Sequence, residues 1–312
     1  MSWFIFALIS LMGWGCADLF YKQGTDEGDR YSHLKIAVWV GLVMGICALL
    51  LLPLAESITL KTILPNALKY LPASIGYIVS MVIGYAGLRY LELSIVSPVQ
   101  NASGAFSGGF LLLWFALKGA NTESLSYLDM FVSGVIIIGV ILLAVAEQRL
   151  SLRNPGDKKY RFGALALLFP LLYCLFDTLG TTADGIILSE EAGLGLGEID
   201  VIILYGLTFL LAGIVSWLVL LIKAKCAYNP FAVSERSKGI AALCEELGQI
   251  FYVYAMAARP VLAAPMVASY CIVSVLLSRL VLKERLTRMQ YLCVALVIAG
   301  IVALGISEGL NA

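Results

Sequence analysis

The sequence predicts an all-α integral membrane protein with ten transmembrane helices. Hydrophobic residues make up 61% of the chain and charged residues only 13%, against roughly 25% charged residues in soluble domains. Apolar runs of about 20 residues, the length that spans a bilayer, recur along the whole chain, and such runs must satisfy their backbone hydrogen bonds as helices. None has the alternating pattern of a β-barrel. The predicted helices are 2–21, 35–53, 69–90, 94–117, 127–146, 162–180, 201–222, 238–258, 261–282 and 288–307.

The first apolar run is predicted to remain in the protein as a helix. Its start, Met1–Ile5, has no basic residue, the run contains Asp18, and further spans follow it. A secretory signal peptide has a basic start and a purely apolar core.

The distribution of lysine and arginine predicts the orientation. Of the 21 basic residues, 17 fall in or beside the odd-numbered loops, whereas the even-numbered loops hold four. Cytoplasmic loops carry the excess of positive charge. The odd-numbered loops are therefore expected in the cytoplasm and both termini outside, in an inner (plasma) membrane.

Several classes of function find no support in the residues. The formal charge is zero, so no basic face for nucleic acid is expected. The single His33 and the seven cysteines form no ligand cluster, so we expect no metal, cofactor or disulfide. No nucleotide-binding loop or catalytic constellation is visible, which argues against an enzyme and against direct ATP hydrolysis.

Four sequence landmarks recur at a nearly constant distance and indicate an internal repeat. The paired landmarks are Asp18 with Asp177, Tyr85-Ala86 with Tyr254-Ala255, Pro98 with Pro265, and Ala146-Glu147 with Ser307-Glu308. They predict two five-helix repeats, 1–148 and 162–312, joined by a cytoplasmic linker at 149–161. Because five is odd, the repeats must be inverted, an arrangement typical of transporters that bind substrate between the repeats.

The segment Ser278–Gln290, followed by Ala299-Gly300-Ile301, is similar to the acidic–Leu-Thr–Gln pattern and glycine-containing last helix of EamA-type drug/metabolite transporters. Trp14-Gly15 resembles the opening of that family. Lys283 and Cys293 stand where the family pattern has glycine. The resemblance implies ten helices, two repeats and transport by alternating access, but supplies no binding residue.

Four acidic residues within the predicted spans are the main candidates for chemistry: Asp18, Asp177, Glu245 and Glu246. Ionisable groups at this depth are costly and usually functional. Three structural alternatives remain: an interfacial ion pair of Asp18 with Lys22, a cap-like position of Asp177 near its helix end, and a later start of the eighth helix that leaves both glutamates at the interface.

Helical spacing places further polar and aromatic residues beside these acids. Trp14 shares a stripe with Asp18, Tyr173 shares one with Asp177, and Gln249 and Tyr252 share one with Glu245, whereas Glu246 lies on a packing or lipid-facing stripe. Asn101 and Tyr270 complete the candidate site. Helix packing through the Gly104–Gly108 motif and interfacial anchoring of tyrosines are the alternatives.

These observations predict a secondary transporter for a small organic cation or zwitterion, such as an amine, a quaternary ammonium compound or an amino acid, with protons as a second ligand. The alternative is an exporter of neutral or aromatic metabolites whose acids serve structure or proton coupling alone. A membrane-bound enzyme or receptor is a third alternative. The expected partners are the bilayer and the substrate. Substrate identity, direction, coupling ion and oligomeric state stay open, and a monomer is compatible with the sequence.

Overall fold

The computed structural model describes residues 2–26, 28–59, 61–118, 127–153, 164–189, 192–223, 228–284 and 286–311. Within them the chain is helical and has no strand, which confirms the predicted all-α class. The helices are α1 (Trp3–Gly24), α2 (Ser32–Leu51), α3 (Ile63–Gly87), α4 (Leu93–Asn101), α5 (Ser103–Lys118), α6 (Tyr127–Arg153), α7 (Leu168–Ile187), α8 (Glu198–Lys223), α9 (Arg236–Ala258), α10 (Pro260–Ala268), α11 (Cys271–Leu277) and α12 (Arg288–Asn311).

Six of the described helical segments are long and apolar enough to cross a bilayer: α1, α2 with its following turn, α3, α8, α9 with its preceding turn, and Pro260–Leu282. Large apolar side chains on the outer surface remain exposed, among them Leu50, Leu117 and Ile222 at more than 70%. Such exposure is costly in water but neutral against lipid. These features confirm a chain suited to a membrane, while the full set of ten spans remains a prediction.

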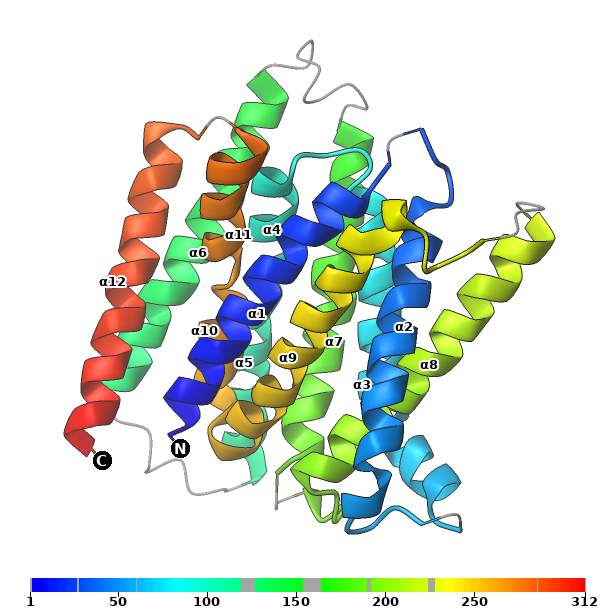
Figure 1. Cartoon of the computed structure of the whole chain (residues 1–312). Coiled ribbons are helices and arrows are strands. Elements are labelled where there is room, and N and C mark those ends of the chain that lie inside the picture. Colours follow the sequence, from blue (N-terminus) through cyan, green and yellow to red (C-terminus); the bar gives the residue numbers. More distant parts are fainter. Residues whose placement is uncertain are drawn as a thin grey trace.

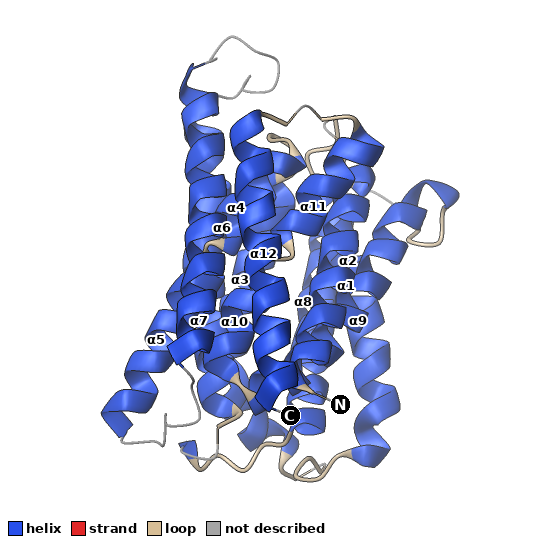
Figure 2. Ribbon diagram, turned by 90° about the vertical axis from the view of Figure 1, so that its left-hand side faces the viewer, coloured by secondary structure: helices blue, strands red, loops and turns tan. Residues whose placement is uncertain are grey.

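The helices run along a common axis, with loops at both ends of the bundle (Figures 1 and 2). The most extensive packing joins α1 to α9, α2 to α8, α3 to α7, α6 to α12 and α5 to α10. Each pair joins the first half of the chain to the second. Both ends of the chain lie at the same end of the bundle (Figure 1).

Two of the predicted spans are interrupted near their middle. Residues 93–118 form α4 and α5 with a break at Ala102, and residues 260–277 form α10 and α11 with a break at Ser269 and Tyr270. Each break begins four residues after a proline, Pro98 or Pro265. Proline removes one backbone hydrogen bond and crowds the turn before it, whereas each break lies one turn after the proline, so the prolines alone do not account for the breaks.

The structure corrects the sequence analysis at three places. Asp184 and Asp200 fall between the helices predicted at 162–180 and 201–222 and so were expected in a loop, but they lie within α7 and α8 and are fully buried. The span expected at 162–180 begins and ends several residues later, as α7. Residues 149–153, expected in the linker, continue α6. The rest of the linker lies outside the described residues.

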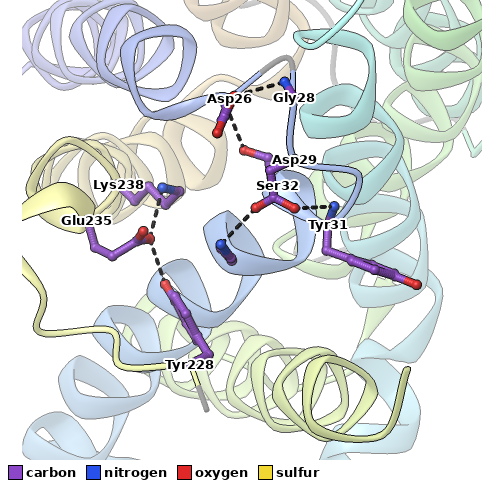
Figure 3. A network of polar contacts seen from close by, with 9 residues as sticks. Asp26, Gly28, Asp29, Tyr31, Ser32, Tyr228, Glu235 and Lys238 are labelled. Carbon is purple, nitrogen blue, oxygen red and sulfur yellow. Dashed lines mark hydrogen bonds and ion pairs between the residues drawn. The ribbon is translucent and has the colours of Figure 1, made fainter. Parts of the chain in front are cut away.

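Two polar clusters lie near each other, one around the loop after α1 and one around the start of α9 (Figure 3). Lys238 Nζ lies 2.8 Å from Glu235 Oε2, which also accepts a hydrogen bond from Tyr228 Oη at 2.9 Å. Asp29 pairs with Lys35 at 2.7 Å. Partial burial would raise the pKa of Asp29, but the hydrogen bonds from Lys35 and from the Tyr31 amide outweigh it and lower that pKa. Lys35 Nζ lies 5.6 Å from the centroid of the Tyr228 ring, a cation–π contact that links the two clusters and so the two halves of the chain.

Candidate functional site

All nine residues selected from the sequence line one cavity inside the bundle. The cavity has a volume of about 50 Å³, which is enough for water molecules but below the size of a metabolite pocket, so a substrate requires the helices around it to move apart. It is bounded by α1, α3, the α4–α5 break, α7, α8, α9 and α10. The nine residues are Trp14, Asp18, Asn101, Tyr173, Asp177, Glu245, Gln249, Tyr252 and Tyr270.

Glu245 lies within α9, well after the helix begins at Arg236, so the alternative of a later helix start is wrong. Its side chain is 8% exposed and lines the cavity. Trp14 Nε1 donates a 3.1 Å hydrogen bond to the Glu245 carbonyl oxygen, which fixes α1 against α9. The neighbouring Glu246 does not line the cavity and faces Cys47 on α2. The helical phase inferred from the sequence therefore agrees with the structure.

Asp18 and Asp177 are held by serine hydroxyls from the interrupted helices. Asp18 Oδ2 accepts from Ser97 Oγ at 2.6 Å and from Ser274 Oγ at 2.7 Å. Asp177 Oδ2 accepts from Ser103 Oγ at 2.6 Å. Both carboxyl groups keep some exposure inside the bundle because they face the cavity.

The sequence left two structural alternatives for these aspartates, an ion pair of Asp18 with Lys22 and a cap-like position of Asp177. Lys22 Nζ donates to the carbonyl oxygens of Leu88 at 2.6 Å and Leu91 at 2.9 Å, so it serves the end of α3 and the loop after it. The cap-like position of Asp177 is wrong, because α7 continues for ten residues beyond it, to Ile187.

Aromatic rings form most of the remaining wall. The Trp14 ring lies 5.0 Å from Tyr252 and 5.7 Å from Tyr270, measured between centroids. Close approach of these rings to the facing helices depends on two glycines: a Cβ at Gly248 would collide with Trp14, and one at Gly84 with Tyr173. The tyrosines that line the cavity are Tyr21, Tyr77, Tyr85, Tyr173, Tyr205, Tyr252 and Tyr270.

Sequence reasoning did not find Tyr21 and Tyr205. Tyr21 follows Asp18 by three residues and so shares its face of α1, a signal that helical spacing contains. Tyr205 lies in an apolar stretch of α8 whose only polar residue at helical spacing is Thr208, a weak signal that does not distinguish it. Tyr254, a further aromatic candidate, packs against Phe6 instead of the cavity.

Three amide side chains lie in the same wall. Asn101 Nδ2 donates to the Ser97 carbonyl oxygen at 2.8 Å, which ties it to its own helix. The Nε2 atoms of Gln100 and Gln249 are buried and have no hydrogen-bond partner. Gly104 and Gly108 pack against α10, so the packing interpretation holds for these glycines while Asn101 lines the cavity.

The charges on the wall have one sign. Asp18, Asp177 and Glu245 are acidic, and no basic residue occurs among the described residues that line the cavity. The described part of the chain also contains no group of three metal-ligating side chains. The cavity therefore offers carboxyl groups, aromatic faces and amide donors to a ligand.

No protein-family model matches the sequence, and no curated protein matches it significantly. The fold is similar to that of a solved structure titled "Crystal structure of protein", with a TM-score of 0.59 and 13% sequence identity over 97% of each chain. At this identity the likeness concerns the fold alone.

Proposed function

We propose that the protein is a secondary transporter for a small organic cation or zwitterion, which binds in the cavity between the halves of the chain and moves by alternating access. The observation that carries this proposal is the grouping of Asp18, Asp177 and Glu245 in one aromatic cavity without a basic lining residue among the described residues. Protons are the expected second ligand of these carboxyl groups.

The physical argument rests on the cost of uncompensated carboxylates. Buried charges are stable when they are paired with an opposite charge, and a cationic ligand supplies that charge. Aromatic faces contribute to the binding of a cation, by about 0.5–2 kcal/mol for each favourable ring. Trp14, Tyr252 and Tyr270 form a connected aromatic wall beside these carboxyl groups.

The unpaired amide donors favour a zwitterion within this class. A buried donor without a partner costs about 1–3 kcal/mol, and a ligand carboxylate or carbonyl group would relieve that cost. The Nε2 atoms of Gln100 and Gln249 are such donors in the cavity wall. In an amino acid or a betaine the two charged groups are close together, so the cationic group can face the carboxyl groups of the cavity while the anionic group accepts hydrogen bonds from these amides.

Reciprocal helix contacts support the inverted-repeat architecture that the mechanism requires. A Cβ at Gly41 of α2 would meet the carbonyl oxygen of Phe209 on α8, and a Cβ at Gly206 would meet that of Met44 on α2. Gly206 and Phe209 lie 165 residues after Gly41 and Met44, respectively. Such an exchange of equivalent contacts is expected from a two-fold relation between repeats.

The same reciprocity occurs between α6 and α12. A Cβ at Gly139 would meet Val297, and a Cβ at Gly300 would meet Ile136; both positions on α12 lie 161 residues after their counterparts. Trp14 and Asp18 likewise precede Tyr173 and Asp177 by 159 residues. Together with the resemblance to EamA-type transporters, these relations favour membership of that superfamily.

A ligand panel on the purified protein tests the proposed function. Choline, betaine and spermidine are expected to raise the apparent thermal midpoint, because a ligand at 100 times its Kd stabilises the native state by about 2.7 kcal/mol. Glucose and indole serve as neutral controls. Stabilisation by indole or glucose alone would favour the exporter of neutral or aromatic metabolites and contradict the cation proposal.

The orientation has its own test. A reporter fused to the C-terminus is expected to signal from the outside, and one inserted beside Lys158 and Lys159 from the cytoplasm, because basic residues concentrate in the odd-numbered loops. A reporter that signals from the cytoplasm at the C-terminus would reverse the predicted orientation.

A further inference from the structure

A further carboxyl group, that of Asp184, lies beyond the three that line the cavity and is surrounded by tyrosines. Asp184 is on α7, seven residues after Asp177, which places it about 10 Å further along the helix axis. It is fully buried and does not line the cavity. The helix α7 runs toward the end of the bundle that holds both termini (Figure 1), and Asp184 lies three residues before its last residue, Ile187.

Both carboxyl oxygens of Asp184 lack a hydrogen-bond partner. The hydroxyl groups of Tyr70 and Tyr77 on α3 and of Tyr252 on α9 surround the carboxyl group closely enough to stabilise its charge, although none has full hydrogen-bond geometry with it in this structure. From α8, Tyr205 is close enough to interact electrostatically with Asp184, and from α5 the apolar Leu111 packs against the adjacent Gly185. No lysine, arginine or histidine occurs among these described neighbours.

The tyrosines connect this carboxyl group with the cavity. Tyr77 Oη and Tyr252 Oη lie 2.7 Å apart, and Tyr77 Oη lies 3.5 Å from Thr181 Oγ1. Tyr77, Thr181 and Tyr252 line the cavity, whereas Tyr70 and Asp184 do not. A phenolic hydroxyl both donates and accepts, so the Tyr77–Tyr252 pair forms a two-membered bridge between the cavity and Asp184.

We propose that Asp184 is a proton-binding site, separate from the substrate cavity and connected to it through the Tyr77–Tyr252 hydroxyl pair. An ionised carboxylate buried without a counter-charge costs several kcal/mol. The neutral acid avoids this cost, and the surrounding hydroxyls suit both forms by turning their O–H groups. That this proton drives transport rests on the proposed function, whereas its binding at Asp184 does not.

Infrared spectroscopy of the purified protein tests the site without a substrate. The wild-type minus Asp184→Asn spectrum should contain the carbonyl-stretch band of a protonated carboxylic acid, and this band should decrease reversibly as the pH is raised. Asp200→Asn is the matched control, since Asp200 is equally buried but accepts hydrogen bonds from the amides of Glu56 and Ser57 at 3.0–3.2 Å. Its difference spectrum should contain carboxylate bands instead. Carboxylate bands for Asp184, or a carbonyl band that never titrates, would overturn the proposal.

Two further variants keep the test decisive if Asp184→Asn does not fold. Tyr70→Phe removes a neighbouring hydroxyl outside the cavity and should shift the frequency of the same band, and an unchanged band would disprove its assignment to Asp184. Tyr77→Phe should slow deuterium exchange of the carboxylic proton several-fold, whereas an unchanged rate would overturn the bridge. A ligand panel without any stabilisation would contradict the proposed function while leaving the infrared result intact.

Discussion

Replacing Glu245 with glutamine is expected to weaken the binding of an organic cation by roughly tenfold to a hundredfold. The substitution keeps the shape of the side chain and removes its charge, and hydrogen bonds to charged groups contribute about 1.5–3 kcal/mol, with 1.4 kcal/mol per factor of ten in Kd. Because protons compete with the cation for the same carboxylate, wild-type binding should strengthen as the pH rises, and this dependence should be flatter in Glu245→Gln. Titration of choline or betaine binding across the neutral pH range measures both effects.

Glu246→Gln is the matched control for this prediction. The two glutamates are adjacent and almost equally buried, at 8% and 7% exposure, but only Glu245 lines the cavity. The control should therefore leave Kd and its pH dependence nearly unchanged. Wild-type binding and pH dependence in Glu245→Gln would show that this carboxyl group has no part in recognition, and equal losses in both variants would point to a general effect of charge on α9.

Helical spacing was sufficient to bring together a candidate site from five distant parts of the sequence. Trp14 with Asp18, Tyr173 with Asp177, and Glu245 with Gln249 each lie on one face of a helix at a separation of four residues. A polar face on a membrane-spanning helix is unfavourable against lipid and therefore usually faces the interior of the bundle. The sequence therefore predicted which side chains face inward, although not their partners.

The features that the sequence did not predict depend on helix ends and on packing between helices. Asp184 was expected in a loop because α7 extends further than its apolar run, and helix ends are the least certain part of a hydropathy pattern. The serine contacts of Asp18 and Asp177 come from Ser97, Ser274 and Ser103 on interrupted helices. The sequence analysis predicted continuous spans at 94–117 and 261–282, and only the tertiary fold shows the interruptions that place these hydroxyls beside the carboxyl groups.

Alanine at Gly41 or at Gly206 is expected to destabilise the protein by a similar amount in each case, about 1–3 kcal/mol, the usual cost of inserting atoms into a packed interface. At both positions the new Cβ would meet a backbone carbonyl oxygen on the facing helix, that of Phe209 or that of Met44. A backbone carbonyl cannot turn aside as a flexible side chain can, so α2 and α8 would have to separate. The apparent thermal midpoints of the two variants in detergent measure the effect.

Gly109→Ala provides the control, because a Cβ at this exposed position on α5 has no atom within 4 Å. It should preserve or raise the thermal midpoint, since alanine favours a helix over glycine by about 0.5–1 kcal/mol. Equal losses at Gly41 and Gly206 are expected only if the two contacts are equivalent under the two-fold relation between repeats. A large loss at one position and none at the other would show that the α2–α8 interface is not reciprocal in the folded protein, and would remove the strongest structural support for inverted repeats.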